Sequence, residues 1–569
     1  IQIDTPEGVI VNKEATIAAR EAQRKLREEF SRWILDDEKR AGELARIYND
    51  TYNAMRLYEA DGSHLVLPGI ADTIEGKHFA LRPHQKSAVW RIIQKGNTLV
   101  AHAVGAGKTY EMIAAGMEMK RLGMINKPLY VVPNHMLEQW SREFLQAYPA
   151  ANILVASKAD LQKEKRRKFV SRIATGNWDA VVMTHSSYGR IPVSVERKEK
   201  HIRDQIEQYE SALRAESEEK KAGRGRSENR LVKQLEKQKM RLEEKLRTLL
   251  EDGKNAKDNQ VNFEELGVDF MFVDEGHNFK NLSYVTRMQR IAGLPNSHSQ
   301  RAEDMLLKTQ YLDELHPGRS LVFATGTPIS NTVAEMYTMT RYVAPHLLRE
   351  SGLEMFDSWA RQFGRTVTGM EISPDGRNFR ENTRFSRFTN VPELLTMFRS
   401  FADVKTKEDL DLPLPDLKGG KPEVVSVKPS ETLTNYVDEL VARAERIRGG
   451  SVDPREDNML KVTSEGRLAA LDMRLIDDTL PADPNGKVAR ATDNIYDIWK
   501  ATSKDRLAQM VFCDLSVPSK QKATGLKEAE NQDQDGETAK PEASPDDLLA
   551  AASRGSFSVY DEIKKNLVD

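Results

Sequence analysis

A glycine-rich stretch between an apolar run and a helix-like run limits what this chain can fold into. It reads His102-Ala-Val-Gly-Ala-Gly-Lys-Thr109, after the apolar residues 98–101 and before residues 110–119. In a strand–loop–helix of this kind, backbone N–H groups face a phosphate, Lys108 reaches the β- and γ-phosphate oxygens, and the Thr109 hydroxyl binds Mg²⁺. The alternative is a glycine-rich turn that binds nothing. His102 stands where the usual pattern begins with glycine.

Further apolar runs alternate with helix-like segments, which is typical of a parallel sheet covered by helices. The runs expected to be strands are residues 128–133, 153–157, 178–185, 270–273 and 320–324, and residues 134–144 are expected to be a helix. Ligands of such sheets bind at the carboxyl ends of the strands. Asn134, His135, Thr184 and His185 stand at two of these ends.

Two carboxylates follow the strand expected at residues 270–273, in the order Asp274-Glu-Gly-His277. A carboxylate at the end of a strand suits magnesium, so Asp274 is expected to hold phosphate-bound Mg²⁺, mostly through water. Glu275 beside it is expected to orient and deprotonate the attacking water. The alternative is a strand that simply ends in a polar turn. It is less favoured because the phosphate loop lies upstream in the same chain.

Two weaker signals flank these motifs. Gln85 lies upstream of the loop in Leu81-Arg-Pro-His-Gln85, where an amide that both donates and accepts can read adenine. An ordinary glutamine at the start of a helix is the alternative. Thr325-Gly-Thr-Pro-Ile-Ser-Asn331 follows the last of these strands, and small hydroxyl residues at a strand end can link a nucleotide site to a moving neighbour.

The composition excludes several classes of protein. The chain has 569 residues, enough for roughly three or four domains. Its net charge of −2 gives no sign of nucleic acid, so any basic surface is local. A single cysteine, Cys513, excludes a disulfide framework and a cysteine-based zinc site, and it fits a reducing cytoplasm. No signal peptide is visible, and no apolar run reaches the ~20 residues of a membrane span. Because the sequence begins at Ile1, we expect an excised piece of a larger polypeptide.

Residues 194–260 interrupt the alternation of strands and helices. Two heavily charged runs carry apolar residues at helical spacing: Ile202, Ile206, Tyr209 and Leu213, and then Leu231, Leu235, Leu242, Leu246 and Leu249. This pattern predicts an antiparallel helical hairpin with a heptad-like seam. Its Arg/Gly tip at residues 223–227 is either a solvated turn or a contact for phosphate.

The regions before and after this sheet are expected to be mostly helical. Residues 1–77 are expected to be a helical lead-in, with an amphipathic helix or helix pair over residues 16–53. Residues 346–420 are expected to be a mixed helical connector that ends in a rigid linker at residues 412–416. Aromatic and basic residues of the connector either bind nucleic acid or pack at the edge of a core; they are Trp359, Phe363, Arg365, Arg384, Phe385, Arg387 and Phe388.

The last part of the chain, residues 421–569, combines helices with two short apolar runs. Strands are expected at residues 424–427 and 509–513, and helices at residues 431–447, 461–475 and 495–499. Residues 520–555 are rich in charged residues, Ala and Pro without an apolar period, and they are expected to be disordered. Residues 557–567 start another helix.

These blocks, in this order, resemble the superfamily 2 helicases of DEAH-box type and, within them, the Swi/Snf-like DNA translocases. The matching blocks span about residues 78–345 and read Leu81-Arg-Pro-His-Gln85, Val104-Gly-Ala-Gly-Lys-Thr109, Val132-Pro-Asn134 through Trp140, Thr184-His185, Asp274-Glu-Gly-His277 and Thr325-Gly-Thr-Pro-Ile-Ser-Asn331. The residues around the loop and Phe512-Cys-Asp-Leu-Ser-Val-Pro518 look like a subgroup of phages and conjugative elements, in which such a helicase is commonly joined to an adenine-specific DNA methyltransferase. The chain has no Asp-Pro-Pro-Tyr or Asn-Pro-Pro-Tyr motif, so it carries no methyltransferase active site.

The resemblance implies an α/β fold with ATP and Mg²⁺ as cofactors and double-stranded DNA as partner. A RecA-like parallel sheet flanked by helices would occupy residues 78–345, with the coiled-coil hairpin at 194–260 inserted in it. An incomplete second RecA-like domain would lie within residues 421–569. The same resemblance implies a cytoplasmic protein of a bacterial or phage-infected cell, with a connection to restriction–modification.

The resemblance also implies roles for single residues. Those implied to bind the nucleotide are Arg82, Gln85, Gly105, Gly107, Lys108 and Thr109; those implied in hydrolysis are Lys108, Asp274 and Glu275; and Thr109 and Asp274 would bind the metal. His277, Thr325, Gly326 and Thr327 would couple hydrolysis to movement, and Asn134, His135, Thr184 and His185 would contact DNA.

Two functions follow from this reading. The first is an ATP-dependent DNA translocase or helicase module. The second is a nucleotide-gated DNA-binding scaffold that docks a methyltransferase or nuclease. That module would lie either on the same parent polypeptide or on a partner protein. In the resembled family, arginines of a late Gln/Arg-rich motif stabilise the γ-phosphate in the transition state. No such motif follows residue 513, so we expect this chain to bind ATP but to hydrolyse it weakly by itself.

Overall fold

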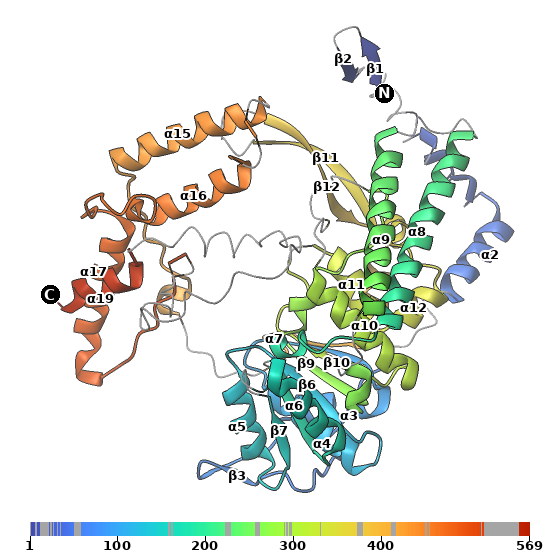
Figure 1. The fold of residues 1–569 in the computed structure, drawn as a ribbon, viewed down its shortest axis with the longest axis horizontal. Coiled ribbons are helices and arrows are strands. Elements are labelled where there is room, and N and C mark those ends of the chain that lie inside the picture. Colours follow the sequence, from blue (N-terminus) through green and yellow to red (C-terminus); the bar gives the residue numbers. More distant parts are fainter. Residues whose placement is uncertain are drawn as a thin grey trace. The chain divides into compact units, whose positions relative to one another are not determined.

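The computed structural model describes most of the chain. The described residues are 2–5, 8–11, 22, 25–26, 28–30, 32–34, 36–50, 58–156, 160, 163–221, 229–255, 262–288, 291, 294, 299–330, 332–372, 379–410, 417–449, 452–453, 456–513, 515–516 and 557–568. The chain divides into two compact units, Ile1–Met370 with Glu381–Pro413 and Glu371–Arg380 with Leu414–Asp569. Figure 1 shows the helices and strands of both units.

A seven-stranded sheet forms the centre of the first unit. All its strands are parallel, and their order is β13-β5-β10-β9-β6-β8-β7. The strands are β5 (Thr98–His102), β6 (Pro128–Val132), β7 (Ile153–Val155), β8 (Ala180–Thr184), β9 (Phe270–Asp274), β10 (Leu321–Ala324) and β13 (Ala402–Lys405). Strands covered on both faces read as continuous apolar runs, and six of the seven were predicted from such runs. The predicted parallel sheet flanked by helices is confirmed.

Helices cover both faces of this sheet, because alternate residues of each strand point to opposite sides. Val100, Tyr130 and Phe272 belong to the core on one face. The helices on this face are α3 (Pro83–Lys95), α4 (Lys108–Arg121) and α5 (Leu137–Ala147).

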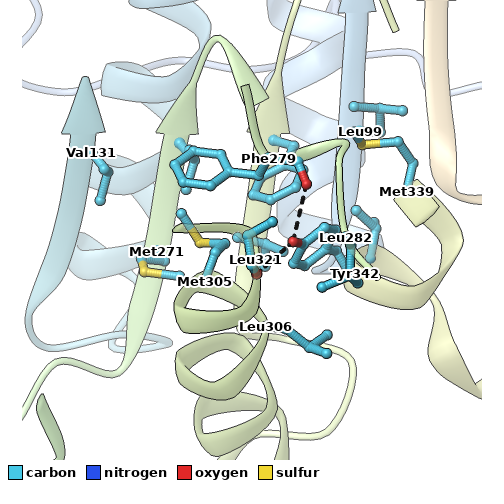
Figure 2. Packing of buried hydrophobic residues seen from close by; sticks show 14 of the residues in the cluster. Leu99, Val131, Met271, Phe279, Leu282, Met305, Leu306, Leu321, Met339 and Tyr342 are labelled. Atoms are coloured by element: carbon cyan, nitrogen blue, oxygen red, sulfur yellow. Dashed lines mark hydrogen bonds between the residues drawn. The ribbon is translucent and has the colours of Figure 1, made fainter. Parts of the chain in front are cut away.

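The core on the other face contains Leu99, Val131 and Met271 (Figure 2). In it the hydroxyl of Tyr342 donates to the carbonyl oxygen of Phe279 at 3.1 Å, which ties a helix to the turn that follows β9. The helices on this side are α6 (Lys163–Thr175), α7 (His185–Tyr188), α10 (Gln300–Leu315), α11 (Ala334–Val343), α12 (Pro345–Glu350), α13 (Phe356–Phe363) and α14 (Val391–Phe401), with short 3₁₀ turns at Phe263–Leu266 and Gly276–Phe279.

The register of the sheet brings three strand ends to one level. Ala324 in β10 pairs with Val100 in β5 and with Asp274 in β9. Because the strands are parallel, the chain leaves all three at the same edge, where ligands of such sheets bind. The loop after β5 and the polar residues after β9 and β10 therefore lie close together.

The helical hairpin predicted at residues 194–260 consists of α8 (Val195–Lys221) and α9 (Asn229–Asn255), which run side by side in Figure 1. Lys239 Nζ on α9 lies 2.8 Å from Glu210 Oε1 on α8. Glu303 on α10 anchors the hairpin, since its carboxylate lies 3.3 Å from His201 and 3.4 Å from Lys245. The predicted hairpin is confirmed, and its tip at residues 223–227 lies outside the described residues.

The segment at residues 346–420 is more than the helical connector that its sequence predicts. It contains helices, but β11 (Gly364–Ile372) and β12 (Phe379–Phe388) form a two-stranded sheet, and β13 joins the central sheet beside β5. Trp359, Phe363 and Phe385 are at most 5% exposed and belong to the core, so these aromatic residues pack rather than bind nucleic acid. The linker expected at residues 412–416 lies outside the described residues.

The lead-in before the sheet is only partly helical, so the expectation of helix over residues 1–77 is wrong at its ends. β1 (Gln2–Thr5) and β2 (Gly8–Val11) pair antiparallel, as do β3 (Thr73–Ile74) and β4 (Lys77–His78). β-Branched residues on both sides of Pro6 favour paired strands. A helix of the amphipathic stretch, α2 (Glu38–Tyr48), is present.

The described part of the second unit consists mainly of helices. These are α15 (Glu431–Arg448), α16 (Met459–Leu471), α17 (Lys487–Thr502) and α19 (Val559–Val568), with short 3₁₀ turns at Lys418–Gly420, Met473–Leu475 and Ser503–Asp505. They correspond to the four helices predicted there.

The strands predicted at residues 424–427 and 509–513 are wrong, because both segments are irregular. A strand needs a hydrogen-bonded neighbour, and Val424 and Phe512 are 86% and 81% exposed rather than covered. The assignment of residues 421–569 to a second RecA-like domain stays a prediction, and residues 520–555 lie outside the described residues. Among the described residues, no helix is both long enough and apolar enough to cross a membrane.

Candidate nucleotide site

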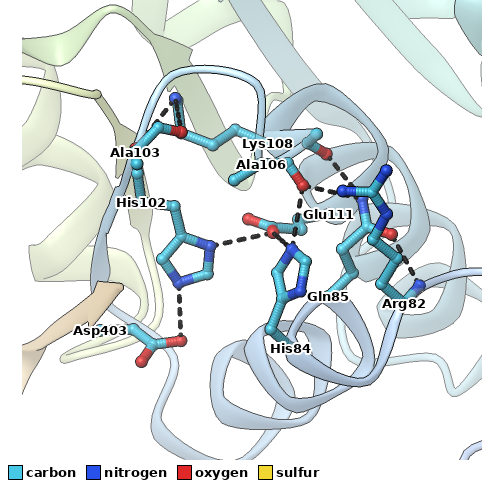
Figure 3. Close-up of polar contacts among 10 residues, drawn as sticks. Arg82, His84, Gln85, His102, Ala103, Ala106, Lys108, Glu111 and Asp403 are labelled. Atoms are coloured by element: carbon cyan, nitrogen blue, oxygen red, sulfur yellow. Dashed lines mark hydrogen bonds and ion pairs between the residues drawn. The ribbon is translucent and has the colours of Figure 1, made fainter. Parts of the chain in front are cut away.

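The predicted phosphate loop connects β5 to α4. Gly105 and Gly107 each have a φ of 87°, which a residue with a Cβ rarely adopts. Lys108, the first residue of α4, donates from Nζ to the carbonyl oxygens of His102 and Ala103 at 3.0 and 3.3 Å. The loop therefore curls around its own lysine, as Figure 3 shows.

Gln85 holds this loop from α3. Its Nε2 donates to the carbonyl oxygens of Ala106 and Gly107 at 3.3 and 3.2 Å, and its Oε1 accepts from the backbone N–H of Arg82 at 2.8 Å. A Cβ on Gly107 would lie 2.3 Å from Gln85 Nε2. Because both amide protons are bonded to the loop, only one lone pair of Gln85 Oε1 remains for a contact with adenine.

A cleft of about 780 Å³ lies beside the loop, within the size range of small-molecule sites. Its lining includes the exposed Arg82 at the start of α3, and Asp403 and Lys405 from β13. His84 also lines it, and its Nε2 lies 3.0 Å from the carbonyl oxygen of Ala106. His84 therefore lines the cleft and contacts the phosphate loop.

Sequence reasoning missed the partners of His102. This residue is fully buried, with Nδ1 2.9 Å from Glu111 Oε1 and Nε2 3.1 Å from Asp403 Oδ2 (Figure 3). Burial disfavours the imidazolium, but the hydrogen bonds to Asp403 and Glu111 outweigh this effect and raise the pKa of His102 to about 9. Glu111 carries no local signal, and Asp403 lies 301 residues further along the chain.

Asp274 ends β9 with both carboxylate oxygens occupied by donors. Its Oδ1 accepts from the backbone N–H of Glu275 at 2.9 Å, and its Oδ2 accepts from Trp140 Nε1 at 3.0 Å. Burial raises the pKa of Asp274, while the Trp140 hydrogen bond and the charge of Lys108 oppose that rise. Trp140 is a further functional candidate; its only sequence signal is its place at the end of the block that begins at Val132.

Glu275, His277 and Thr325 form a hydrogen-bonded chain at the same edge. His277 Nδ1 lies 3.0 Å from Glu275 Oε2 and 2.9 Å from Thr325 Oγ1. Glu275 has a φ of 51°, an uncommon conformation for a residue with a side chain. The hydrogen bond from His277 lowers the pKa of Glu275, so the side chain is a carboxylate. The chain of contacts joins the end of β9 to the end of β10.

The residues after β10 also approach the phosphate loop. The backbone N–H of Thr325 donates to Val100 in β5 at 3.0 Å, and the backbone N–H of Thr327 donates to Thr325 Oγ1 at 3.1 Å. A Cβ on Gly326 would lie 2.8 Å from Val104 Cγ2 and 3.6 Å from Lys108 Nζ. The predicted coupling residues are thus brought together with the predicted phosphate-binding lysine.

The four residues expected to contact DNA separate into two pairs. Asn134 and His135 are exposed after β6. Thr184 is buried and accepts from the backbone N–H of Ser187 at 3.1 Å, as the N-cap of α7. His185 is buried as well, and its Nε2 donates to the carbonyl oxygen of Asp274 at 2.9 Å. Both side chains are thus buried and hydrogen-bonded within the protein, which argues against a direct contact with DNA.

Comparisons with known proteins identify the family of the part of the chain that carries this site. Residues 90–406 match a family described as probable helicase domain, which takes in the whole central sheet and ends next to β13. Residues 2–54 match a domain of unknown function, DUF8437.

Several characterised proteins are similar to parts of the chain. Defense against restriction protein B of Escherichia phage P1 is 27% identical over 441 residues, which cover 69% of this chain and 18% of that protein. The SWI/SNF-related matrix-associated actin-dependent regulator of chromatin subfamily A containing DEAD/H box 1 of Xenopus tropicalis is 22% identical over 337 residues, or 58% of this chain and 24% of that protein. This chain therefore spans less than a quarter of the length of either relative.

Among solved structures, the SWI2/SNF2 ATPase core of Sulfolobus solfataricus in complex with dsDNA matches with a TM-score of 0.32 and 14% identity, covering 77% of this chain and 66% of that chain. The family match itself extends over more than half of the chain. The motifs at the edge of the sheet and this match lead to one conclusion: the chain belongs to the probable helicase domain family and is similar to the Swi/Snf-like helicases.

Proposed function

We propose that this chain is an ATP-driven DNA translocase or helicase module, which binds ATP with Mg²⁺ at the carboxyl edge of its sheet and couples hydrolysis to movement on DNA. The observation that carries the proposal is the chain of contacts from Glu275 through His277 to Thr325, beside Lys108. A phosphate loop alone would suit any nucleotide-binding protein. A carboxylate that is linked through a histidine to the end of a neighbouring strand suits a protein in which hydrolysis moves that neighbour.

Nucleotide and metal would be held by groups whose chemistry fits them. Lys108 and the backbone N–H groups at the start of α4 would bind the phosphates, because a lysine and a helix N-terminus both attract anions. Mg²⁺ in nucleotide sites uses one or two protein oxygens together with phosphates and water. The half-buried Thr109 hydroxyl and the Asp274 carboxylate are such oxygens, and among the described residues no group of three or more His, Cys, Asp or Glu competes for a metal.

The base would occupy the cleft of about 780 Å³ that Arg82 and His84 line. Gln85 would act on the nucleotide in two ways. Its remaining Oε1 lone pair would accept from the adenine amino group, and its two bonds to the loop would hold the phosphate-binding backbone in shape.

Glu275 would position the attacking water. Its pKa is lowered by the hydrogen bond from His277, and a carboxylate of low pKa is a weak base in the ground state. Its main contribution would therefore be orientation, with the proton taken up as negative charge develops during phosphoryl transfer. Lys108 lies close enough for its charge to lower the pKa of Glu275 and Asp274 alike, so it would also stabilise the charge on the phosphate oxygens.

Double-stranded DNA is the proposed partner. The solved SWI2/SNF2 core is described as bound to dsDNA, and this supports the same choice here. Asn134 and His135 are the residues that we propose contact the DNA, because they are exposed at the sheet edge, and we withdraw this role from the enclosed Thr184 and His185. We also propose a methyltransferase or nuclease module on the parent polypeptide, supported by the much greater length of the phage relative.

The test is ATP hydrolysis by the full chain with and without duplex DNA, together with nucleotide binding. Lys108→Ala should abolish nucleotide binding. Glu275→Gln should bind nucleotide like the wild type and turn over at least ~100-fold more slowly. We expect the wild-type rate to be low but raised by DNA. Nucleotide-dependent DNA binding with equal, DNA-independent turnover in wild type and Glu275→Gln would instead identify a nucleotide-gated scaffold.

A further inference from the structure

The imidazole ring of His102 lies between two carboxylates that come from different elements. Glu111 belongs to α4 and Asp403 to β13, and their oxygens lie 2.9 and 3.1 Å from the two ring nitrogens. A carboxylate accepts hydrogen bonds and has no proton to donate. The ring must therefore carry a proton on both nitrogens to satisfy both neighbours, which makes it a buried cation that bridges a helix and a strand.

Further charged or polar groups lie beside each of the two carboxylates of this bridge. Burial disfavours the Asp403 carboxylate, but the His102 hydrogen bond and the charges of Arg91 and Lys405 lower its pKa. Arg91 also donates to the carbonyl oxygens of Arg399 and Ser400, directly before β13. On the other side, His84 Nε2 lies 3.8 Å from Glu111 Oε1, and among the described residues Glu111 Oε2 has no hydrogen-bond partner. A histidine that only filled space would not require two carboxylates, one at each ring nitrogen.

The backbone of His102 leads from this bridge to the lysine of the loop. Its carbonyl oxygen accepts from Lys108 Nζ at 3.0 Å. The next residue, Ala103, accepts from the same Nζ at 3.3 Å and donates its own N–H to the carbonyl oxygen of Lys405 at 2.9 Å. The two oxygens that hold Lys108 thus belong to residues fixed against β13, one through its side chain and one through its backbone.

We propose that His102 is a positioning residue for the phosphate loop: its imidazole, hydrogen-bonded on both nitrogens, fastens the start of the loop to α4 and β13 and so presets Lys108 for phosphate. The inference rests on the proposed function, because it concerns the residue that would bind the nucleotide. It adds Glu111 and Asp403 to the site as the two anchors of the loop.

The first test is nucleotide affinity, measured by titrating the full chain with a fluorescent ADP analogue in the presence of Mg²⁺. His102→Gln replaces the cation by a neutral amide that donates from a single nitrogen. Affinity should fall roughly tenfold, the equivalent of about 1.4 kcal/mol, because the loop is no longer fastened in the shape that presents Lys108 to phosphate. His346→Gln, at an exposed histidine of α12, is the matched control and should bind like the wild type.

The second test separates positioning from mere packing by its pH dependence. Wild-type affinity should be nearly constant between about pH 7 and 8 and fall as pH rises through the pKa of His102, about 9. Asp403→Asn keeps a side chain that can accept from Nε2 but removes the charge, so the fall should move to lower pH by about one unit. Both proteins keep Lys108, His84 and Glu111, so a difference between the two profiles reports on the charge beside His102.

The outcomes are distinguishable. Weaker binding by His102→Gln together with the shifted profile of Asp403→Asn supports the proposal. Nucleotide binding by the wild type that is unchanged in His102→Gln, with the same pH profile in Asp403→Asn, overturns the inference and leaves the proposed function intact. A wild type that binds no nucleotide overturns the proposed function, and the inference with it. If His102→Gln does not fold, as judged by circular dichroism, the Asp403→Asn profile alone decides.

Discussion

Replacement of Thr325 by valine tests whether one buried hydroxyl couples Glu275 to the rest of the sheet edge. Thr325 is fully buried. Its Oγ1 lies 2.9 Å from His277 Nδ1, and the same ring nitrogen lies 3.0 Å from Glu275 Oε2. Because one nitrogen serves both oxygens, the hydroxyl and the Glu275 carboxylate compete for His277. Valine keeps the shape of threonine and ends this competition, so His277 should hold Glu275 more tightly and leave it less free to orient water.

The size of the effect follows from the bonds removed. Thr325 Oγ1 takes part in two hydrogen bonds, with His277 and with the backbone N–H of Thr327. At ~0.5–1.5 kcal/mol each, their loss should lower the free energy of unfolding by ~1–3 kcal/mol. If ~1–2 kcal/mol of the hydrogen bonding shifts onto Glu275, kcat should fall by a factor of ~5–30. KM for ATP should change little, because the hydroxyl is bonded to His277 and Thr327 and not to Lys108.

The assay is steady-state ATP hydrolysis with saturating duplex DNA, with Thr325→Ser as the matched control. Serine keeps the hydroxyl and loses one methyl group, so it should cost ~0.8 kcal/mol of stability and leave kcat close to that of the wild type. Valine should do the reverse, with a low kcat in a protein of nearly unchanged packing volume. Wild-type turnover by Thr325→Val, or an equal loss of kcat in Thr325→Ser, would refute the role given to the hydroxyl.

Three further outcomes follow from single contacts. Gly107→Ala should reduce nucleotide affinity at least ~tenfold in calorimetric titration, because its Cβ would meet Gln85 Nε2. Gly123→Ala is the control, since this glycine also has a positive φ but a Cβ there would have nothing within 4 Å. It should bind nucleotide normally and lose only the ~1–2 kcal/mol of stability that backbone strain costs. Burial lowers the pKa of His185 to about 4, so the folded state keeps this ring neutral. The free energy of unfolding should therefore fall by up to about 3 kcal/mol as pH falls from 6.5 to 4. In urea unfolding, the free energy of unfolding of His185→Gln should depend less on pH over that range. The pKa of Glu303 is lowered to about 2, because the effect of burial is outweighed by hydrogen bonds from His201 and Lys245. Its contribution to the free energy of unfolding is therefore present above pH 4.5 and is lost as pH falls through 2. Glu303→Gln at pH 7 should speed hydrogen exchange in α8 and α9, and unchanged exchange would contradict the anchoring role.

The central sheet and the phosphate loop could be predicted from the sequence because both depend on local signals. Strands covered on both faces need continuous apolar runs, and residues 128–132 and 270–273 are such runs. The loop needs glycines and a lysine at fixed spacing, and Gly107 and Lys108 supply them. The alternation of strands with helices predicts a parallel sheet, and in such a sheet the end of the strand before Asp274 lies at the same edge as the loop.

Other parts could not be predicted because they depend on contacts between distant segments. Thr184 and His185 carry polar side chains at a strand end, which indicates a surface, yet a helix cap and the carbonyl oxygen of Asp274 account for them. The apolar residues at 424–427 have the composition of a strand, but their structure is irregular and Val424 is exposed. The local sequence indicates which conformations and contacts are favourable for a residue, but its neighbours in the folded protein determine which of them it adopts.

β13 contributes to the nucleotide site although it belongs to none of the sequence motifs. Its four residues, Ala402–Lys405, are too few and too polar for an apolar run, and they lie far along the chain from the phosphate loop. Yet the sheet places them beside β5, where Asp403 bonds to the ring of His102 and the carbonyl oxygen of Lys405 accepts from Ala103. Both residues whose carbonyl oxygens hold Lys108 are therefore fixed by this strand. A change that loosens β13 must loosen the phosphate loop, so the strand belongs to the nucleotide site even though no side chain of it needs to touch a phosphate.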